Sequence, residues 1–484
     1  MNFDKSIDPR DYGKTARENI ESINDEFLGP GFLLFIDQLL VAMGNWVYWL
    51  IVFRLTSTFE VGQATIIYSL VLLTSLLTQL GLEYPLLKKS STPQGSKILG
   101  TALLVELIIT LASVPIMIYL INNQFHQSLH EFASIAVAIL IFSSISFVTR
   151  FALLGVAKTK TVLLIDLTSI VLKFITGYAL ISVGLGALGL LLSFMFQSAF
   201  LTTATLVVAK RIFGFGLGNA RYIKEIIGDA LVNTPSKLSR MLMLSFSVVL
   251  LASFGISSSE IGFFYLAFMI SIVIGSLSSS MSFMVLPASA VSKADLSSDS
   301  LRVGLSFTAP MIVAVIVAPK LILSVIGPQY ILAETILLVL SIAIVPSSIV
   351  LNTISRFNNL NKSRKLVLTG STQIAMFLGS FVYLVPTYGT LGAAFSVLIS
   401  FVAASIPSII WSERELIRYI ACSCAAIIAG TAVGFTITFV DGIHPIITIL
   451  SSSSVTLTLV IVLKNTSIAE IRKLVEPIMT IGKR

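Results

Sequence analysis

Charged side chains are scarce in this sequence of 484 residues. Aspartate, glutamate, lysine and arginine together make up 12% of it, whereas hydrophobic residues make up 55%. Because soluble globular domains contain about 25% charged residues, this composition excludes a water-soluble fold. The net charge of +8 does not indicate nucleic-acid binding, because the basic residues lie in short gaps between apolar stretches, where they would face the anionic headgroups of membrane lipids.

Residues suited to metal binding or covalent chemistry are also rare. The sequence has two cysteines, Cys422 and Cys424, and three histidines, His126, His130 and His444. Two residues apart on a helix, the thiols point about 200° apart and form neither a disulfide nor a metal pair. The histidines match no zinc spacing, and neither a glycine-rich phosphate loop nor a large polar domain is present. We therefore expect no cofactor, no metal site and no enzyme activity.

Apolar stretches of roughly 20 residues recur throughout the chain, and each is long enough to cross the ~30 Å core of a bilayer as a helix. The sequence thus predicts an all-α polytopic membrane protein with about fourteen transmembrane helices. Tight turns at Gly184–Gly186 and Pro386–Gly389 divide two of the longer runs. The expected helices are 28–53, 61–87, 97–121, 131–154, 159–183, 186–208, 228–254, 261–291, 303–326, 331–354, 366–385, 388–411, 417–440 and 443–463.

Lysine and arginine are concentrated in every second gap between these helices. Eighteen lie in the even-numbered gaps, four and five lie in the N- and C-terminal tails, and the odd-numbered gaps contain only Arg54 and Lys320. Positive residues accumulate on the cytoplasmic side of membrane proteins. We therefore predict a multi-pass protein of the cell membrane with both termini and all even-numbered loops in the cytoplasm.

The chain repeats itself at a spacing of about 200 residues. Glu60-Val61-Gly62 begins the second helix and Glu260-Ile261-Gly262 begins the eighth, while Gly186-Ala187-Leu188-Gly189 and Gly389-Thr390-Leu391-Gly392 begin the sixth and twelfth. A repeat unit of six helices is even, so the two copies share one orientation and form a parallel repeat.

This repeat divides the chain into two six-helix bundles followed by two additional helices. The expected segments are a cytoplasmic N-terminal segment at 1–27, a first bundle at 28–208, a cytoplasmic linker at 209–227, a second bundle at 228–411, two additional helices at 412–464 and a cytoplasmic tail at 465–484.

Charged residues within the apolar helices are candidate binding groups, because a charge near the bilayer centre costs at least ~2.5–3.5 kcal/mol. Lys173 lies near the middle of its helix and could bind a phosphate or an acidic sugar. Asp166 lies on the same face of that helix. The alternative is a structural pair between Lys173 and Asp166, but seven residues separate them by about 10 Å along the helix axis, which is too far for a direct bridge unless both side chains extend.

Three further charges lie inside helices. Lys237 and Arg240 share one face of the seventh helix, where they could meet an anionic group that enters from the inner leaflet or could extend to the headgroups. Asp37 lies midway along the first helix, where a carboxylate could exchange a proton or Na⁺ as access alternates, or could form a structural hydrogen bond. Arg150 is expected to anchor its helix at the cytoplasmic surface.

Three segments of the chain resemble polysaccharide biosynthesis flippases of the Wzx type. Segment 326–365 contains the family's Gly-x-x-Tyr motif, which begins at Gly327. Segment 384–401 contains Pro-x-x-Gly-x-x-Gly-Ala-Ala, which begins at Pro386, and segment 53–88 resembles the opening hairpin of the family. The resemblance extends over roughly residues 28–465.

The resemblance implies membership of the multidrug/oligosaccharidyl-lipid/polysaccharide superfamily, with its V-shaped, MATE-like transporter fold. It also implies a flippase that moves a polyprenyl-(pyro)phosphate-linked glycan to the outer leaflet, and we expect a monomer. Ser239-Arg240 stands where the family often has an acidic residue before an arginine, so no ion-coupling role is transferred to that position. A multidrug/cation antiporter of the same superfamily and a membrane glycan polymerase or ligase are the alternatives.

Overall fold

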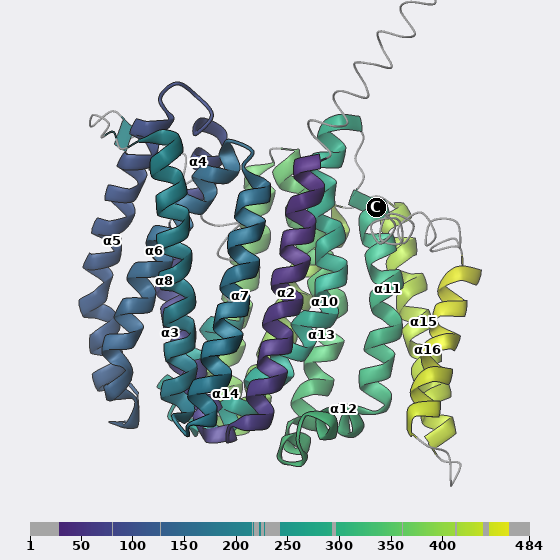
Figure 1. The fold of residues 1–484 in the computed structure, drawn as a ribbon. Helices are drawn as coiled ribbons and strands as arrows, with labels where there is room; N and C mark the ends of the chain where they lie inside the picture. Colours follow the sequence, from purple (N-terminus) through teal and green to yellow (C-terminus); the bar gives the residue numbers. More distant parts are fainter. Residues whose placement is uncertain are drawn as a thin grey trace, which may run out of the picture.

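The structure is a computed structural model, and all the elements in the part of the chain that it describes are helices (Figure 1). The described residues are 29–463 except 80, 126, 215, 217–221, 224–226, 228–242, 293–296, 361, 412–413 and 439–444. The predicted terminal segments 1–27 and 465–484 lie outside the described residues, as do Lys237 and Arg240.

The described residues of the first half form six long helices and two short ones. They are α2 (Gly29–Leu55), α3 (Thr58–Thr78), α4 (Glu83–Lys89), α5 (Gly95–Asn123), η2 (Gln127–Phe132), α6 (Ala133–Gly155), α7 (Thr159–Ser182) and α8 (Gly186–Phe213).

The second half begins, within the described residues, at an apolar helix over Met243–Ser253. The elements after it are α10 (Ser258–Ser292), α11 (Ser297–Val317), α12 (Pro319–Ile326), η3 (Pro328–Ala333), α13 (Glu334–Asn359), α14 (Ser363–Ile410), α15 (Arg414–Thr438) and α16 (Pro445–Val462).

Eleven described helices are long and apolar enough to cross a membrane. One of them, the 48-residue α14, is two spans, because its backbone leaves the helical conformation at Gly389. Helix α2, with 27 residues, is about 40 Å long, which is enough to cross a bilayer, whereas the apolar helix at Met243–Ser253 is described over too few residues to count as a span. The all-α polytopic fold predicted from the sequence is therefore confirmed.

The internal repeat is visible where α3 crosses α10. A Cβ atom on Gly62 would lie 1.7 Å from the carbonyl oxygen of Ser258, and a Cβ atom on Gly262 would lie 2.5 Å from the carbonyl oxygen of Thr58. Each glycine thus brings its own helix against the backbone at the start of the other. The glycine of the Glu-aliphatic-Gly motif therefore makes an equivalent contact in each half.

Two other features recur in both halves. The predicted tight turns contain Gly186, with φ of 48°, and Gly389, with φ of 55°, a left-handed conformation that glycine adopts without steric cost. In addition, the 3₁₀ helices η2 and η3 have six residues each and begin 201 residues apart, at Gln127 and Pro328. The sequence reading did not predict these 3₁₀ helices.

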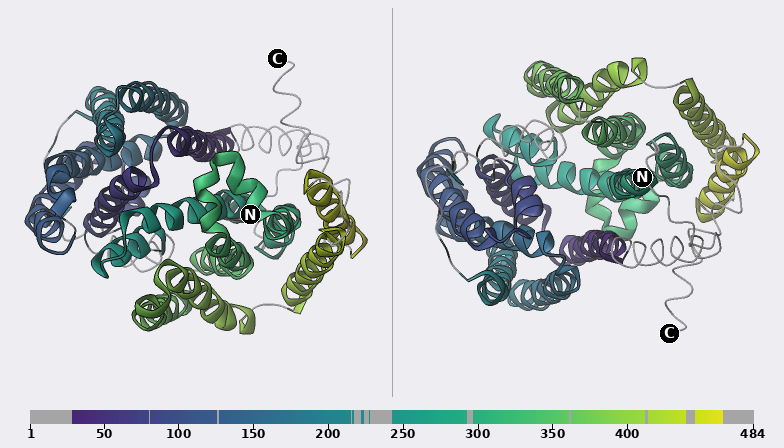
Figure 2. Two further views of the ribbon diagram at one scale, coloured as in Figure 1. Left: turned by 90° about the horizontal axis from the view of Figure 1, so that it is seen from below. Right: turned by 90° about the horizontal axis from the view of Figure 1, so that it is seen from above.

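The two halves meet mainly through α10, which packs against α3 and α2 of the first half. Figure 2 shows α15 and α16 at one edge of the molecule, beside the second half. These two helices pack against each other and against α11, where Ser453 Oγ donates a hydrogen bond of 3.1 Å to the carbonyl oxygen of Pro310. The contact between the halves therefore depends on the repeated helices and not on the added pair.

Candidate functional site

Helices α2 and α7 pack side by side and form the α2–α7 interface. A Cβ atom on Gly44 would lie 2.8 Å from Cγ2 of Ile170, and one on Gly177 would lie 2.8 Å from the ring of Tyr48. The contacts advance along both helices together, so α2 and α7 run in the same direction, as the first and fifth spans of the predicted topology should. Their close approach brings polar groups of both helices within reach of each other.

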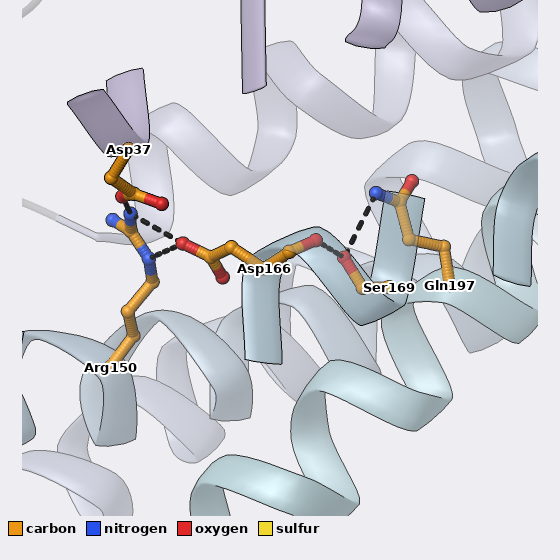
Figure 3. A network of polar contacts seen from close by, with 5 residues as sticks. All are labelled: Asp37, Arg150, Asp166, Ser169 and Gln197. Carbon is orange, nitrogen blue, oxygen red and sulfur yellow. Dashed lines mark hydrogen bonds and ion pairs between the residues drawn. The ribbon is translucent and has the colours of Figure 1, made fainter. Parts of the chain in front are cut away.

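Three charged side chains from α2, α6 and α7 form an ion-paired triad at this interface. Arg150 Nη2 lies 2.7 Å from Oδ2 of Asp37 and 2.7 Å from Oδ2 of Asp166, and Arg150 Nε donates to the same oxygen of Asp166 at 2.9 Å. Figure 3 shows the guanidinium between the two carboxylates. The network continues to α8, because Ser169 Oγ donates to the Asp166 carbonyl oxygen at 2.7 Å and accepts from Gln197 Nε2 at 3.4 Å.

The triad combines one positive and two negative groups in a buried place. The side chains of Asp37 and Asp166 are only 1% and 8% exposed, whereas that of Arg150 is 21% exposed. Oδ1 of Asp37 is buried and has no hydrogen-bond partner among the described residues. Asp37 lies eight residues after the start of α2, about 12 Å inside the helix end. A ligand could therefore approach the guanidinium more readily than either carboxylate.

Lys173 lies deeper in the same interface, near the middle of α7, and is 1% exposed. Its ammonium donates a hydrogen bond to Oδ1 of Asn45 on α2. The nitrogen lies 4.6 Å from the centroid of the Tyr48 ring and 5.3 Å from that of the Phe194 ring. Aromatic faces attract a cation, so Lys173 occupies an aromatic cage. Its contacts in the described part of the chain are uncharged.

The aromatic cage is continuous with rings that connect the two halves. Tyr48 Oη lies 2.5 Å from Ser193 Oγ, and its ring is 6.0 Å from that of Trp49. Trp49 in turn lies 4.8 Å from Tyr265 on α10, and Phe53 lies 5.4 Å from Tyr330 on η3. A movement of the two halves relative to each other would therefore disturb the rings next to Lys173.

The structure brings together three residues that the sequence singled out separately, Asp37, Asp166 and Lys173. The prediction that Arg150 is a surface anchor is wrong, because its guanidinium pairs with two buried carboxylates. Asp166 and Lys173 do not pair with each other, as their spacing indicated, since Asp166 pairs with Arg150 and Lys173 bonds Asn45.

Sequence reasoning therefore missed Arg150 and Asn45 as members of the site. Arg150 had one signal that could have found it, because it precedes the end of α6 by five residues and is followed directly by apolar side chains. Because an arginine side chain can extend to the membrane surface from about 7 Å inside a helix, this signal did not separate a buried ion pair from a surface anchor.

Comparison with known proteins establishes the fold. No family model and no curated protein sequence matches the chain. The structure is similar to that of a lipid II flippase MurJ in an inward closed conformation, with a TM-score of 0.68, 15% identity and coverage of 89% of this chain and 98% of that chain.

The structure is also similar to two multidrug transporters. The TM-score is 0.57 with the MATE multidrug transporter DinF-BH, at 16% identity and with 82% and 97% of the two chains covered. It is 0.51 with an outward-facing MATE family transporter of the MOP superfamily, at 16% identity and with 81% and 96% covered. The chain is thus a polytopic helical membrane protein whose fold is similar to that of these solved transporters.

Proposed function

We propose that this protein is a flippase that moves a polyprenyl-(pyro)phosphate-linked oligosaccharide from the cytoplasmic to the outer leaflet. Transport would proceed by alternating access and would serve polysaccharide or glycoprotein assembly. The sugar and phosphate groups would pass between the helix bundles while the polyprenyl chain stays in lipid. We expect the protein to act as a monomer in the cell membrane, with both termini cytoplasmic.

The observation that supports this proposal most is the Lys173 ammonium, buried near the middle of α7 with uncharged partners in the described structure. A cation at this depth costs several kcal/mol relative to a neutral side chain. An anionic substrate that reaches it would offset this cost, since a phosphate offers charge and strong hydrogen-bond acceptors. The likeness to a solved lipid II flippase adds support from the fold.

Asp37 is the proposed site of coupling to a cation. Its carboxylate is almost fully buried, and one of its oxygens lacks a hydrogen-bond partner among the described residues. A proton or Na⁺ bound there would neutralise the surplus negative charge of the triad. Lys237 and Arg240 remain proposed contacts for the phosphate groups, and Asp166 would orient Arg150.

A multidrug/cation antiporter is the second candidate, because two of the similar structures are multidrug transporters. A site for cationic drugs should contain acidic groups without basic partners. At the α2–α7 interface, however, Asp37 and Asp166 share Arg150, and the ammonium of Lys173 lies farther along α7. The positive charges of Arg150 and Lys173 equal the negative charges of the two aspartates, so the interface has no net formal charge. This favours the flippase over the antiporter, whose site should be acidic.

The experiment that tests the proposal is a measurement of lipid-linked oligosaccharides in a deletion strain. Mass spectrometry would identify the glycan-lipid, and a membrane-impermeant reagent would report its leaflet. We expect complete glycan-lipid to accumulate in the inner leaflet only. An unchanged pool together with raised sensitivity to cationic dyes would reject the flippase and favour the antiporter.

A further inference from the structure

We propose that Arg150 binds a phosphate group of the substrate in place of the carboxylate of Asp37. This inference rests on the proposed function, because it assumes a phosphate-linked lipid as the substrate. Arg150 would be a binding residue, and the substrate would break its ion pair with Asp37.

The first argument is that the two carboxylates make different numbers of contacts with the guanidinium. Asp166 accepts two contacts from Arg150, through Nε at 2.9 Å and Nη2 at 2.7 Å. Asp37 accepts one contact, through Nη2 at 2.7 Å. Two donors on one acceptor orient a guanidinium better than one. Asp166 would therefore keep Arg150 in position while the contact with Asp37 is exchanged.

The second argument is access. The Arg150 side chain is 21% exposed, but that of Asp37 is 1% exposed. A ligand that enters from the nearby helix ends would thus contact the guanidinium and not the carboxylate behind it. Guanidinium groups bind phosphates bidentately, and a phosphate with more negative charge than a carboxylate would compete effectively for the same donors.

The third argument is the position of Arg150 relative to Lys173. Arg150 is held by Asp166, and Lys173 follows Asp166 by seven residues on the same face of α7, about 10 Å deeper. A phosphate could therefore move from the guanidinium to the ammonium along one helix face. When it occupies Arg150, Asp37 loses its described basic partner, and a proton or Na⁺ would then replace that partner. The exchange would couple substrate binding to cation binding.

The test is a binding measurement on the purified full-length protein in detergent, with farnesyl pyrophosphate as the probe. Asp37→Asn keeps the shape of the side chain but weakens its hold on Arg150, so we expect the Kd to fall about tenfold, as for loss of one competing charged hydrogen bond. Arg150→Gln should raise the Kd about tenfold or more. In the double variant, Asp37→Asn should no longer improve binding.

Arg54→Gln is the matched control, because it removes an equal charge near the opposite ends of the helices, where Arg54 donates to the carbonyl oxygen of Val325. It should leave the Kd unchanged. Arg150→Lys keeps the charge and covers the case in which Arg150→Gln fails to fold; we expect it to weaken binding less than Arg150→Gln does.

Any of four results would overturn the inference. If Asp37→Asn leaves the Kd unchanged or raises it, the carboxylate does not compete with the phosphate. If the benefit of Asp37→Asn persists without Arg150, the guanidinium is not the binding group. Should Lys173→Ala abolish binding while the triad variants do not alter it, the inference fails and the proposed function stands. Absence of binding in every variant would reject the phosphate site altogether.

Discussion

Where the first half buries Asp166 and Lys173, the second half has Thr369 and Met376 at the spacing of 203 residues that relates Gly186 to Gly389. Thr369 Oγ1 bonds the carbonyl oxygen of Lys365 within its own helix, at 3.0 Å. Among the described residues, the buried charged side chains all belong to the first half; they are Asp37, Glu83, Glu106, Asp166 and Lys173.

The two halves share structural elements but differ in their buried charges. Both halves have a six-residue 3₁₀ helix, η2 or η3, and a glycine turn with positive φ, at Gly186 or Gly389. The described part of the second half forms these elements with neutral side chains at the positions matching Asp166 and Lys173. Because buried charges are costly in a membrane, we propose that Asp166 and Lys173 of the first half serve transport.

The largest expected effect concerns Lys173. Lys173→Ala should abolish lipid-linked oligosaccharide transport, while expression and helix content stay normal, because the ammonium is the proposed contact for phosphate. Met376→Ala, at the matching position of the second half, should leave transport within about twofold, since ordinary substitutions away from a site cost little. Leaflet-resolved mass spectrometry of the glycan-lipid would measure both. Normal transport in the Lys173→Ala variant would show that Lys173 is not the contact for the phosphate group.

Arg150→Ala should reduce stability more than any neutral substitution at the matching positions of the second half. It leaves two buried carboxylates of α2 and α7 without their basic partner, and breaking such a pair costs about 3–5 kcal/mol; the partial exposure of Arg150 favours the lower end. Thr369→Val should cost less than about 1 kcal/mol. Thermal unfolding in detergent would compare the two. Equal losses of stability would contradict the contrast between the halves.

The two halves should respond alike at the crossing of α3 and α10. Gly62→Ala and Gly262→Ala each place a methyl group against backbone, and overpacking of this kind costs about 1–3 kcal/mol. Gly379→Ala is the control, because a Cβ atom there meets no atom within 4 Å, and alanine in a helix is better than glycine by roughly 0.5–1 kcal/mol. Unfolding temperatures that fall for only one of the first two variants would break the proposed symmetry of the repeat.

The smallest expected effect is at the two tight turns. Gly389→Ala should cost about 1–3 kcal/mol, because its φ of 55° and ψ of −132° lie in a region that a residue with a side chain rarely adopts. Gly186→Ala should cost more, because its Cβ atom would also lie 2.1 Å from Oε1 of Glu60, whereas at Gly389 the nearest atom is 3.9 Å away. The same unfolding measurement would rank the pair, and the reverse order would show that the Glu60 side chain moves aside freely.

Several features of the fold were predictable because they depend on local properties of the chain. The length of an apolar run and the position of a glycine turn are properties of neighbouring residues, so the spans and the turns at Gly186 and Gly389 followed from the sequence. The parallel repeat followed from two short motifs and an even helix count. The candidate charges Asp37, Asp166 and Lys173 were identified because charges within apolar runs are rare.

The sequence by itself determined that this chain is a polytopic helical membrane protein, and it singled out Asp37, Asp166 and Lys173 as charges within apolar helices. Only the tertiary structure decided that Arg150 pairs with Asp37 and Asp166, and that Asn45 accepts from Lys173. In a membrane, the lipid-facing and protein-facing sides of a helix are both apolar. Hydrophobic periodicity therefore does not reveal which side a helix turns toward its neighbours, and partners such as Asp37 and Arg150, 113 residues apart, become known only from the packed fold.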